Sequence, residues 1–394
     1  MNSGKVVISN LQYFSLVIGG TVAFGHFVYS RLIIANAGRD GWISVLFSGL
    51  LGTGVAYLLS KLAVLQRERS FVTHAVAVWG VWAGGATGIL YSVYFLFIGA
   101  FALHLLGSVL GSIYPRTPRE VWLLFLLMAV LWAVLAGLEV IARSVQLLLP
   151  LLIAMGVAAT LLAMPDRDYS QLLPILYHGF APVWRGTVIM LTMGAEMIAF
   201  NMITPHVKNR EALIKQGFIL VLVVTLFYIG PIAGPVTLFG EQVARSLAYP
   251  TFTELQYINA SPLLERLDLF AIILWVTGAY FRIIIYGFCA AKAVTQLSGA
   301  KQSNSYTIPV LTILVGMSLL MPIDRADDFT FLDTAYPVIA LGMGLAIPAA
   351  LLLTTLFKQR RSNAAPPARP KTEQAGQEEP AGQTGQASSQ EGQA

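Results

Sequence analysis

The 394-residue chain is 56% hydrophobic and only 11% charged, and its mean hydropathy is +0.69. Soluble globular proteins carry about 25% charged residues, so this composition excludes a soluble enzyme and indicates a protein embedded in a lipid bilayer. The formal net charge of +5 does not by itself indicate an anionic partner. Membrane proteins carry an excess of Lys and Arg in their cytoplasmic loops, and this excess can account for the charge. The single cysteine, Cys289, lies in an apolar run, so the sequence offers no disulfide framework and no cysteine-based metal site.

Apolar runs of about 18 residues or more recur along the chain, and each is long enough to cross a hydrocarbon core of about 30 Å as a helix. The hydropathy predicts ten transmembrane helices, at residues 11–35, 41–64, 83–112, 120–137, 144–164, 183–203, 214–239, 267–296, 306–322 and 332–357. Residues 70–85 have an apolar face too short to span, which predicts an interfacial helix. Residues 249–260 are expected to form a short helix across an exterior loop, and Ser261 and Pro262 to open the eighth spanning helix.

These helices predict an all-α polytopic membrane protein whose transmembrane domain covers residues 1–357. We expect a 5+5 inverted repeat, with repeat one at about 11–164 and repeat two at about 183–357. The remaining residues, 358–394, are predicted to form a disordered cytoplasmic tail. The last 33 residues contain no Val, Ile, Leu, Met, Phe, Trp, Tyr or Cys and cannot bury a core.

The distribution of basic residues predicts the orientation of the chain. In the ten-helix arrangement, thirteen Lys and Arg residues lie on the side of both termini, or fifteen with the two in the tail, and eight lie on the other side. Cytoplasmic loops carry the excess of Lys and Arg, so both termini are predicted to be cytoplasmic. The basic residues are scattered over loops rather than gathered in a stripe, which gives no reason to expect nucleic acid as a partner.

Glycine-rich interruptions in two predicted helices indicate where a ligand could bind, because broken helices are tolerated where their backbone lines a cavity. Residues 19–25 (GGTVAFG) lie near the middle of the first helix, and residues 192–196 (TMGAE) lie at a similar depth in the sixth. Each cluster alone fits close helix packing equally well. Their matching positions in the two five-helix halves favour the interpretation that helices 1 and 6 are both broken.

Two broken helices would present free N–H groups to a carboxylate and free carbonyls to an ammonium group, which fits a zwitterionic amino acid. The third and eighth helices would complete the pocket. The predicted ligand-binding residues are Gly19, Gly20, Thr21, Phe24, Gly25, Tyr94, Met193, Gly194, Glu196, Thr277 and Tyr280.

Glu196 is the most conspicuous acidic residue because it lies inside an apolar stretch, where an unpaired charge costs several kcal/mol. It could bind an ammonium group, carry a proton, or pair with one of the two intrahelical cations, Arg31 and Arg282. A structural ion pair or a protonated carboxyl is an equally good explanation. Arg31 lies near a helix end and is expected to extend toward the interface.

Motifs for catalysis or cofactor binding are not found. The sequence has no Walker motif and no G-x-S-x-G elbow, and its histidines lack metal-ligand spacing. We therefore expect no enzyme activity, no cofactor and no metal.

Three stretches resemble the B-subunit family of nutrient germinant receptors from endospore-forming bacteria, a branch of the amino acid–polyamine–organocation transporter superfamily. They are residues 41–50 (GWISVLFSGL), 143–150 (RSVQLLLP) and 249–275 (YPTFTELQYINASPLLERLDLFAIILW). The third is the most specific, since it joins Pro-Thr to a Glu-Arg-Leu-Asp-Leu opening of an apolar, Trp-containing helix. The likeness covers about residues 5–357 and excludes the tail.

The resemblance implies a ten-helix inverted-repeat protein of the spore inner membrane, or another bacterial plasma membrane, that binds a germinant such as L-alanine. It also implies two partners, an A-type subunit and a lipid-anchored C-type subunit, and ligand-triggered germination. Proton-coupled relatives in the superfamily often carry a Lys in the fifth helix, and residues 146–164 contain none. This counts against coupled transport, although sodium-coupled relatives also lack that Lys.

Three functions therefore stay open at this point. The leading hypothesis is a ligand-sensing receptor subunit, and the main alternative is a secondary amino-acid permease with the same fold and pocket. The third is a scaffold or ion channel, in which Glu196 would line a water or ion path and the glycines would only pack.

Overall fold

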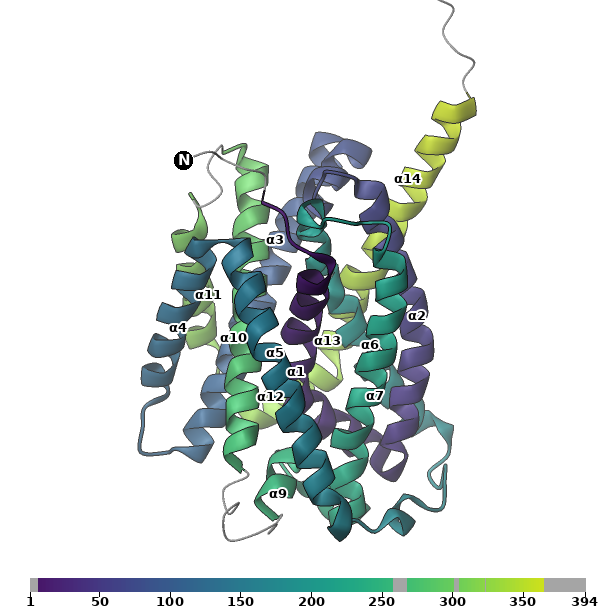
Figure 1. Cartoon of the computed structure of the whole chain (residues 1–394), viewed down its shortest axis with the longest axis vertical. Coiled ribbons are helices and arrows are strands. Elements are labelled where there is room, and N and C mark those ends of the chain that lie inside the picture. Colours follow the sequence, from purple (N-terminus) through teal and green to yellow (C-terminus); the bar gives the residue numbers. More distant parts are fainter. Residues whose placement is uncertain (1–5, 258–267, 301–304, 323, 365–394) are drawn as a thin grey trace, which may run out of the picture. The chain divides into compact units, whose positions relative to one another are not determined.

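A computed structural model describes residues 6–257, 268–300, 305–322 and 324–364, and nearly all of them are helical (Figure 1). The chain divides into two units, Met1–Leu356 and Phe357–Ala394. The first unit holds the candidate site. Ser261 and Pro262, predicted to open the eighth helix, lie outside the described residues, as does most of the predicted tail.

The first half of the chain forms long helices joined by short connections. Its elements are α1 (Asn10–Ala37), the 3₁₀ turn η1 (Gly38–Asp40), α2 (Gly41–Gln66), α3 (Phe71–Ile113), α4 (Arg119–Ala136), α5 (Leu138–Ala163), η2 (Met164–Asp166) and η3 (Tyr169–Leu172).

The second half adds several short helices between its long ones. Its elements are α6 (Phe180–Glu196), η4 (Met197–Met202), η5 (Thr204–His206), α7 (Leu213–Phe239), α8 (Glu241–Ser246), α9 (Pro250–Tyr257), α10 (Asp268–Ser298), α11 (Thr307–Leu320), α12 (Arg325–Asp333), α13 (Ala335–Leu341), the π-helical turn η7 (Gly342–Ala346) and α14 (Ile347–Ala364).

Each of the ten predicted spanning helices has a counterpart among these elements. Eight helical stretches of the described residues are long and apolar enough to cross a membrane, and α11 is apolar but shorter. The first of the eight, Val28–Gln66, contains the end of α1 and the whole of α2. The last predicted helix, 332–357, corresponds to α13, η7 and α14 together, and the predicted exterior helix corresponds to α9.

The predicted break in the first helix is wrong. The α1 helix runs without interruption from Asn10 to Ala37. Its glycines serve close packing instead: a Cβ atom added at Gly19 would lie 2.7 Å from Val145 Cγ1, and one added at Gly20 would lie 2.8 Å from Ile285 Cδ1. Because these positions lack side chains, α5 and α10 can approach α1 closely there.

Three boundaries also differ from the prediction. Residues 71–85 of the predicted interfacial helix lie in α3, which joins two helices across a kink at Gly80, where φ is 83°, so the short first helix ends before Gly80 rather than at 85. The α5 helix starts at Leu138 rather than at 144, directly after the turn that ends α4. The predicted tail is helical from 358 to 364, since α14 continues to Ala364 through residues with good helix propensity and a basic residue in the last turn.

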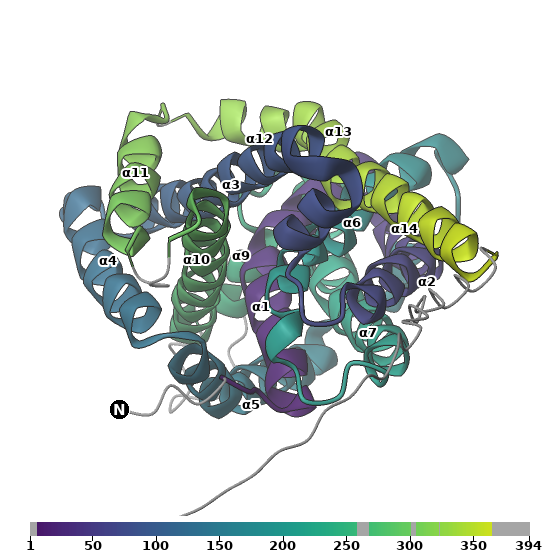
Figure 2. The same cartoon turned by 90° about the horizontal axis from the view of Figure 1, so that it is seen from above.

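The α1 and α6 helices lie in the middle of the first unit, surrounded by the other long helices (Figure 2). The α1 helix packs against α10, α6, α5 and α7, while α3 packs extensively along α10 and α2 along α7 and α6. The α4 and α11 helices lie at the edge, beside α3 and α10. This arrangement encloses the side chains of α1 and α6 and makes their contacts the natural place for a buried site.

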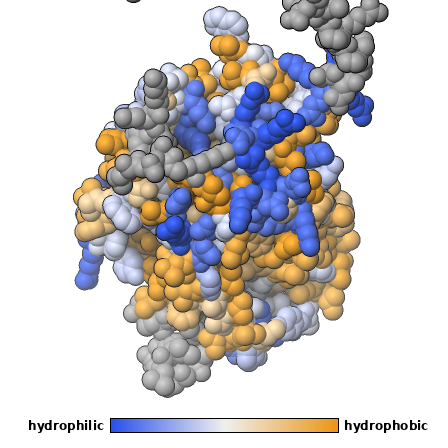
Figure 3. Space-filling view, turned by 45° about the horizontal axis from the view of Figure 1, so that its top comes forward, coloured by the Kyte–Doolittle hydropathy of each residue, from blue (hydrophilic) through white to orange (hydrophobic). Residues whose placement is uncertain are grey.

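Apolar side chains also cover the flanks of the helices. Leu50, Trp132, Leu147 and Leu226 are among the exposed large hydrophobic residues. Figure 3 shows hydrophilic residues gathered on the end of the molecule that comes forward, with an apolar surface around and below them. A large apolar surface of this kind is stable in contact with lipid and not with water.

Candidate ligand-binding site

The α6 helix changes its hydrogen-bonding pattern at the position where the sequence predicts a break. Its α-helical part ends at Glu196, and the chain continues as the 3₁₀ segment η4. Two of the backbone carbonyls near this transition are used by α10: the Tyr286 hydroxyl donates to Glu196 O at 3.1 Å, and the Cys289 thiol donates to Ala199 O at 3.3 Å. The interruption is therefore stabilised by side chains of a neighbouring helix, as buried non-helical backbone in a membrane requires.

Glu196 forms a buried ion pair with Arg282 of α10. The Glu196 Oε2 and Arg282 Nη2 atoms are 2.7 Å apart, and the two side chains are 0% and 7% exposed. The Arg282 guanidinium also lies over the Tyr286 ring, 5.1 Å from its centroid, and donates from Nη1 to Gly20 O of α1 at 3.4 Å. Of the roles considered for Glu196, pairing with Arg282 is the one observed. Each charge is stable in this apolar setting because the other compensates it.

Tyrosine hydroxyls complete the surroundings of this pair. The Tyr336 hydroxyl of α13 donates to Glu196 Oε1, so both carboxylate oxygens have a neighbour. We call Gly20, Glu196, Arg282, Tyr286 and Tyr336 the central cluster. It joins α1, α6, α10 and α13, and a change at any of these residues acts on several helices at once.

A further layer of polar groups surrounds the central cluster on α1, α3, α6 and α7. Tyr29 and Thr192 share a hydrogen bond of 2.9 Å between their hydroxyls, and the Tyr228 hydroxyl donates to Val22 O at 3.1 Å. Tyr94 of α3 is 4% exposed, and its buried hydroxyl has no hydrogen-bond partner. Such an unsatisfied buried hydroxyl is available to a ligand.

The predicted residues of the first helix have mixed surroundings. The Gly20 carbonyl belongs to the central cluster, whereas Gly19 packs against α5 and α10. A Cβ atom at Gly25 would lie 2.3 Å from the Tyr228 hydroxyl oxygen, so Gly25 permits the close approach of α7. Thr21 is fully buried and donates to Val17 O in its own helix at 2.6 Å. Phe24 lies in α1, but its side chain is not among those that the structure describes.

The predicted residues of α6 and α10 are only partly brought to the same place. Met193 is 2% exposed, and its sulfur lies 3.3 Å from the position of a Cβ atom at Gly25. Gly194 instead lines a small cavity between α2, α6 and α7. Thr277 and Tyr280 are half-buried on α10, but Tyr280 lies two residues before Arg282, about 200° around the helix. The structure therefore places Tyr280 on a different face from Arg282.

The sequence does not indicate Tyr286 and Tyr336 of the central cluster as ligand-binding residues, and it indicates Arg282 only as a possible partner of Glu196. The spacing of Arg282 and Tyr286, four residues apart in a helix, was the available signal, because it places both on one face. Nothing local singles out Tyr336, which reaches Glu196 only through the packing of α13 against α6.

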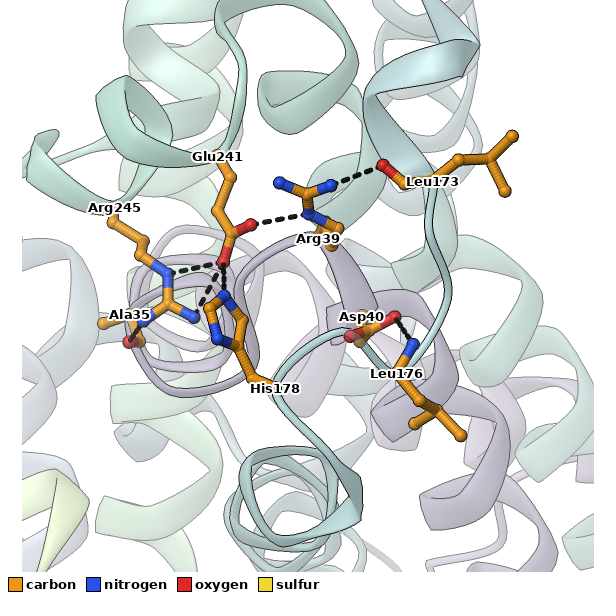
Figure 4. Close-up of polar contacts among 8 residues, drawn as sticks. All are labelled: Ala35, Arg39, Asp40, Leu173, Leu176, His178, Glu241 and Arg245. Carbon is orange, nitrogen blue, oxygen red and sulfur yellow. Dashed lines mark hydrogen bonds and ion pairs between the residues drawn. The ribbon is translucent and has the colours of Figure 1, made fainter.

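A second group of charged residues lies in the connections, at the end of α1 distant from the N-terminus (Figures 1 and 4). Glu241 of α8 accepts from Arg39 Nε at 2.6 Å and lies 2.9 Å from Arg245 Nη2 and 3.3 Å from His178 Nε2. We call Arg39, His178, Glu241 and Arg245 the loop cluster. Beside it, Asp40 accepts from the Leu176 backbone N–H at 2.9 Å. These contacts join η1, the segment before α6, and α8.

Metal ligands do not gather in the described part of the chain, where no group of three or more His, Cys, Asp or Glu side chains could hold an ion. Arg31, the other intrahelical cation, donates to Arg245 O at 2.6 Å near the loop cluster, and it is not the partner of Glu196. Arg282 is therefore the intrahelical cation that pairs with Glu196.

This helical architecture is similar to that of two solved structures with the transporter fold. It resembles Mhp1, a nucleobase-cation-symport-1 family transporter, in a closed conformation with bromovinylhydantoin bound: the TM-score is 0.68 at 13% identity, covering 92% of this chain and 82% of that one. It also resembles MhsT in complex with L-phenylalanine, with a TM-score of 0.65 at 14% identity and 89% of each chain covered. The chain is thus an integral membrane protein with the 5+5 transporter fold, as the sequence predicts.

Sequence comparison then gives the family. A family model described as spore germination protein matches residues 7–326, and the chain belongs to this family. The chain is similar to spore germination protein XB of Bacillus anthracis, with 25% identity over 362 residues that cover 90% of this chain and 99% of the relative. The predicted resemblance is confirmed, and neither the family nor the fold is one of enzymes.

Proposed function

We propose that this protein is the ligand-binding membrane subunit of a germinant receptor, and that it binds a small zwitterionic amino acid such as L-alanine at the central cluster. The observation that carries the proposal is the buried Glu196–Arg282 pair, which presents one negative and one positive charge at the meeting point of α1, α6 and α10. A zwitterion offers the complementary pair of charges and brings no net charge into the apolar interior.

The geometry suggests how such a ligand would be held. In the conformation described, Arg282 and Tyr336 occupy the two oxygens of Glu196, so a ligand binds here by taking over part of these contacts. Its carboxylate would accept from Arg282, and its ammonium group would lie at Glu196, where the C-terminal end of α6 also favours positive charge. The unpartnered hydroxyl of Tyr94 would supply a further hydrogen bond.

Replacing an internal ion pair by ligand contacts gives the receptor a way to change state. A ligand shifts a conformational equilibrium only when it binds one state more tightly than the other. If the pair holds α6, α10 and α13 together in the unliganded state, the ligand favours a state with different helix contacts. In this proposal the change is relayed to A-type and C-type subunits in the spore inner membrane, with both termini of this chain in the cytoplasm.

The test uses purified protein in proteoliposomes with a panel of labelled amino acids, and bound and accumulated label are measured together. Saturable binding without accumulation supports the receptor. Tyr94→Phe, which removes only a hydroxyl oxygen, is expected to weaken binding about tenfold, the loss of one hydrogen bond to a charged group. Absence of saturable binding for every amino acid would overturn the proposal. Co-purification with A-type and C-type subunits tests the assembly separately.

A permease is the second candidate, and the fold favours it. The two solved structures described above have the transporter fold, and one of them is a complex with L-phenylalanine. The same liposomes distinguish the two functions. Accumulation of label that depends on an ion gradient would make the protein a transporter using this site.

A further inference from the structure

A large cavity lies among α1, α8 and α12, at the end of α1 beside the loop cluster. Its volume is about 490 Å³, within the range of small-molecule sites. We call it the α12 pocket and define it by Arg31, Asn36, Ser246, Phe329, Thr330 and Asp333, which are among its lining residues. None of the central-cluster residues lines it. Thr330 and Asp333 are exposed, so a small molecule can reach this pocket from the surrounding water.

Arg31 of α1 brings a positive charge to the pocket. Its Nη1 atom donates to Arg245 O at 2.6 Å, and its guanidinium lies 5.7 Å from the centroid of the Phe329 ring. Arg245 in turn donates from Nη1 to Ala35 O at 3.2 Å, so α1 and α8 are joined by bonds in both directions (Figure 4). Both partners of Arg31 are uncharged, a backbone carbonyl and an aromatic ring. Its positive charge is therefore not matched by a carboxylate of the described residues.

Asp333, the last residue of α12, brings a negative charge to the same pocket. Asn36 Nδ2 donates to its Oδ1 at 2.5 Å, and no Lys, Arg or His among the described residues pairs with it. Phe329 and Asp333 are four residues apart, so the ring that Arg31 covers and the Asp333 carboxylate lie on one face of α12, about one turn apart. The two opposite charges therefore line one pocket without forming an ion pair with each other.

The arrangement of these two charges defines the class of ligand. The hydroxyls of Ser246 and Thr330 each donate to a backbone carbonyl of their own helix at 2.7 Å, so the charged groups are the main source of specificity. The Arg31 guanidinium presents paired donors that fit a carboxylate. The Asp333 carboxylate only accepts, so it requires a donor such as an ammonium group. A molecule with a single charge could use only one of the two.

We propose that the α12 pocket is a binding site for a small zwitterionic amino acid, separate from the central cluster. The carboxylate of the ligand accepts from Arg31, and its ammonium group donates to Asp333. Because the pocket opens to water, each contact contributes less than it would in the interior, and binding uses both. The inference goes beyond the function proposed for the central cluster and does not depend on it. Asp333 precedes Tyr336 by three residues, so occupancy of the pocket acts on the chain next to the residue that donates to Glu196.

The experiment is equilibrium dialysis of the full-length purified protein with each of the twenty standard amino acids in labelled form. Asp333→Asn removes the charge but keeps an oxygen that can accept from Asn36, and it is expected to weaken one class of sites about tenfold. Asp327→Asn is the matched control, because Asp327 is exposed on the same helix and does not line the pocket. It is expected to bind like the parent protein. Arg31→Gln should weaken the same class of sites and gives a second test from the opposite wall.

Derivatives of the amino acid that binds test the assignment of each charge. Its amide lacks the carboxylate and its N-acetyl derivative lacks the ammonium group, and both are expected to bind the pocket about tenfold more weakly or worse. If the N-acetyl derivative binds the Arg31-dependent sites as tightly as the amino acid does, the pocket is an anion site and the inference is overturned.

The outcomes separate the two proposed sites. Binding that Tyr94→Phe weakens, and that Asp333→Asn and Arg31→Gln leave at the parent affinity, would overturn the inference while the central site stands. The reverse result would support the α12 pocket and count against the central site. Equal weakening by Asp333→Asn and Asp327→Asn would show a general effect of charge on α12 and would also overturn the inference.

Discussion

The central cluster and the loop cluster are both built on a glutamate that faces arginine, yet their surroundings differ. Glu196 is fully buried between helices and meets a single arginine, whereas Glu241 meets two arginines and His178, whose side chains are 23% to 45% exposed. In the interior, each charge depends on its partner, because bulk water and salt do not reach it. In the connections, water and salt compensate the charges as well, so each pair contributes less. The Glu196–Arg282 ion pair is therefore expected to be essential to the fold, whereas the contacts of Glu241 can be weakened with little loss of stability.

The largest expected loss of stability comes from breaking the Glu196–Arg282 ion pair. Arg282→Met leaves Glu196 buried without a partner, and we expect unfolding free energy to fall by about 3–5 kcal/mol. Thermal unfolding in detergent, followed by a fluorescence or aggregation signal, measures this. The double variant Arg282→Met with Glu196→Leu removes both charges and should recover most of the loss. If the single and double variants are equally stable, the pair is not a coupled unit.

A smaller loss of stability is expected from removing one hydroxyl group of the central cluster. Tyr336→Phe deletes the donor to Glu196 Oε1, and a hydrogen bond to a charged group contributes about 1.5–3 kcal/mol. Tyr94→Phe is the matched control, since its hydroxyl has no partner and its removal should leave stability unchanged or slightly raised. Equal destabilisation by both variants would contradict the assignment of Tyr336 to the cluster.

Glycines next to the central cluster allow a third comparison. Gly25→Ala places a Cβ atom 2.3 Å from the Tyr228 hydroxyl oxygen, and the overpacking is expected to cost about 1–3 kcal/mol. At Gly194 no atom lies within 4 Å of the Cβ position, so Gly194→Ala should fold as well as the parent. The yield of monodisperse protein and its unfolding temperature measure both. A stable Gly25→Ala variant would show that α7 can move away from α1 without loss.

The smallest loss of stability is expected from a substitution in the loop cluster, and its size depends on pH. Burial would raise the pKa of Glu241, but the hydrogen bond from Arg39 and the charges of Arg245, Arg39 and His178 together lower it below its ordinary value. The stabilisation is therefore present above the ordinary pKa of a glutamate and is lost as the pH falls through the lowered pKa. Glu241→Gln should lower stability at neutral pH by about 1 kcal/mol or less.

Salt provides the control for this last prediction. Raising the ionic strength should reduce the difference between the parent and Glu241→Gln, because exposed pairs are screened. The difference between the parent and Arg282→Met should hardly change under the same conditions. A salt effect of equal size at both clusters would remove the distinction between them.

The sequence alone determines the membrane class, the places of the long apolar helices and the position where α6 changes. Composition and hydropathy suffice for the first two, because a bilayer requires long apolar helices whatever their neighbours are. The glycine-containing stretch 192–196 marks the third, because a broken helix in a membrane is tolerated where its backbone is buried in protein or lines a cavity.

Only the tertiary structure decides which partner Glu196 has and what the glycines of α1 do. Arg31 and Arg282 are both intrahelical cations, and the packing of α10 against α1 and α6 selects Arg282. Gly19 and Gly25 resemble a helix break in the sequence, but α1 is continuous there, and both glycines lie close to side chains of α5, α10 and α7. The physical reason is that hydropathy depends on each residue's own side chain, whereas ion pairing and close packing depend on residues brought together from distant parts of the chain.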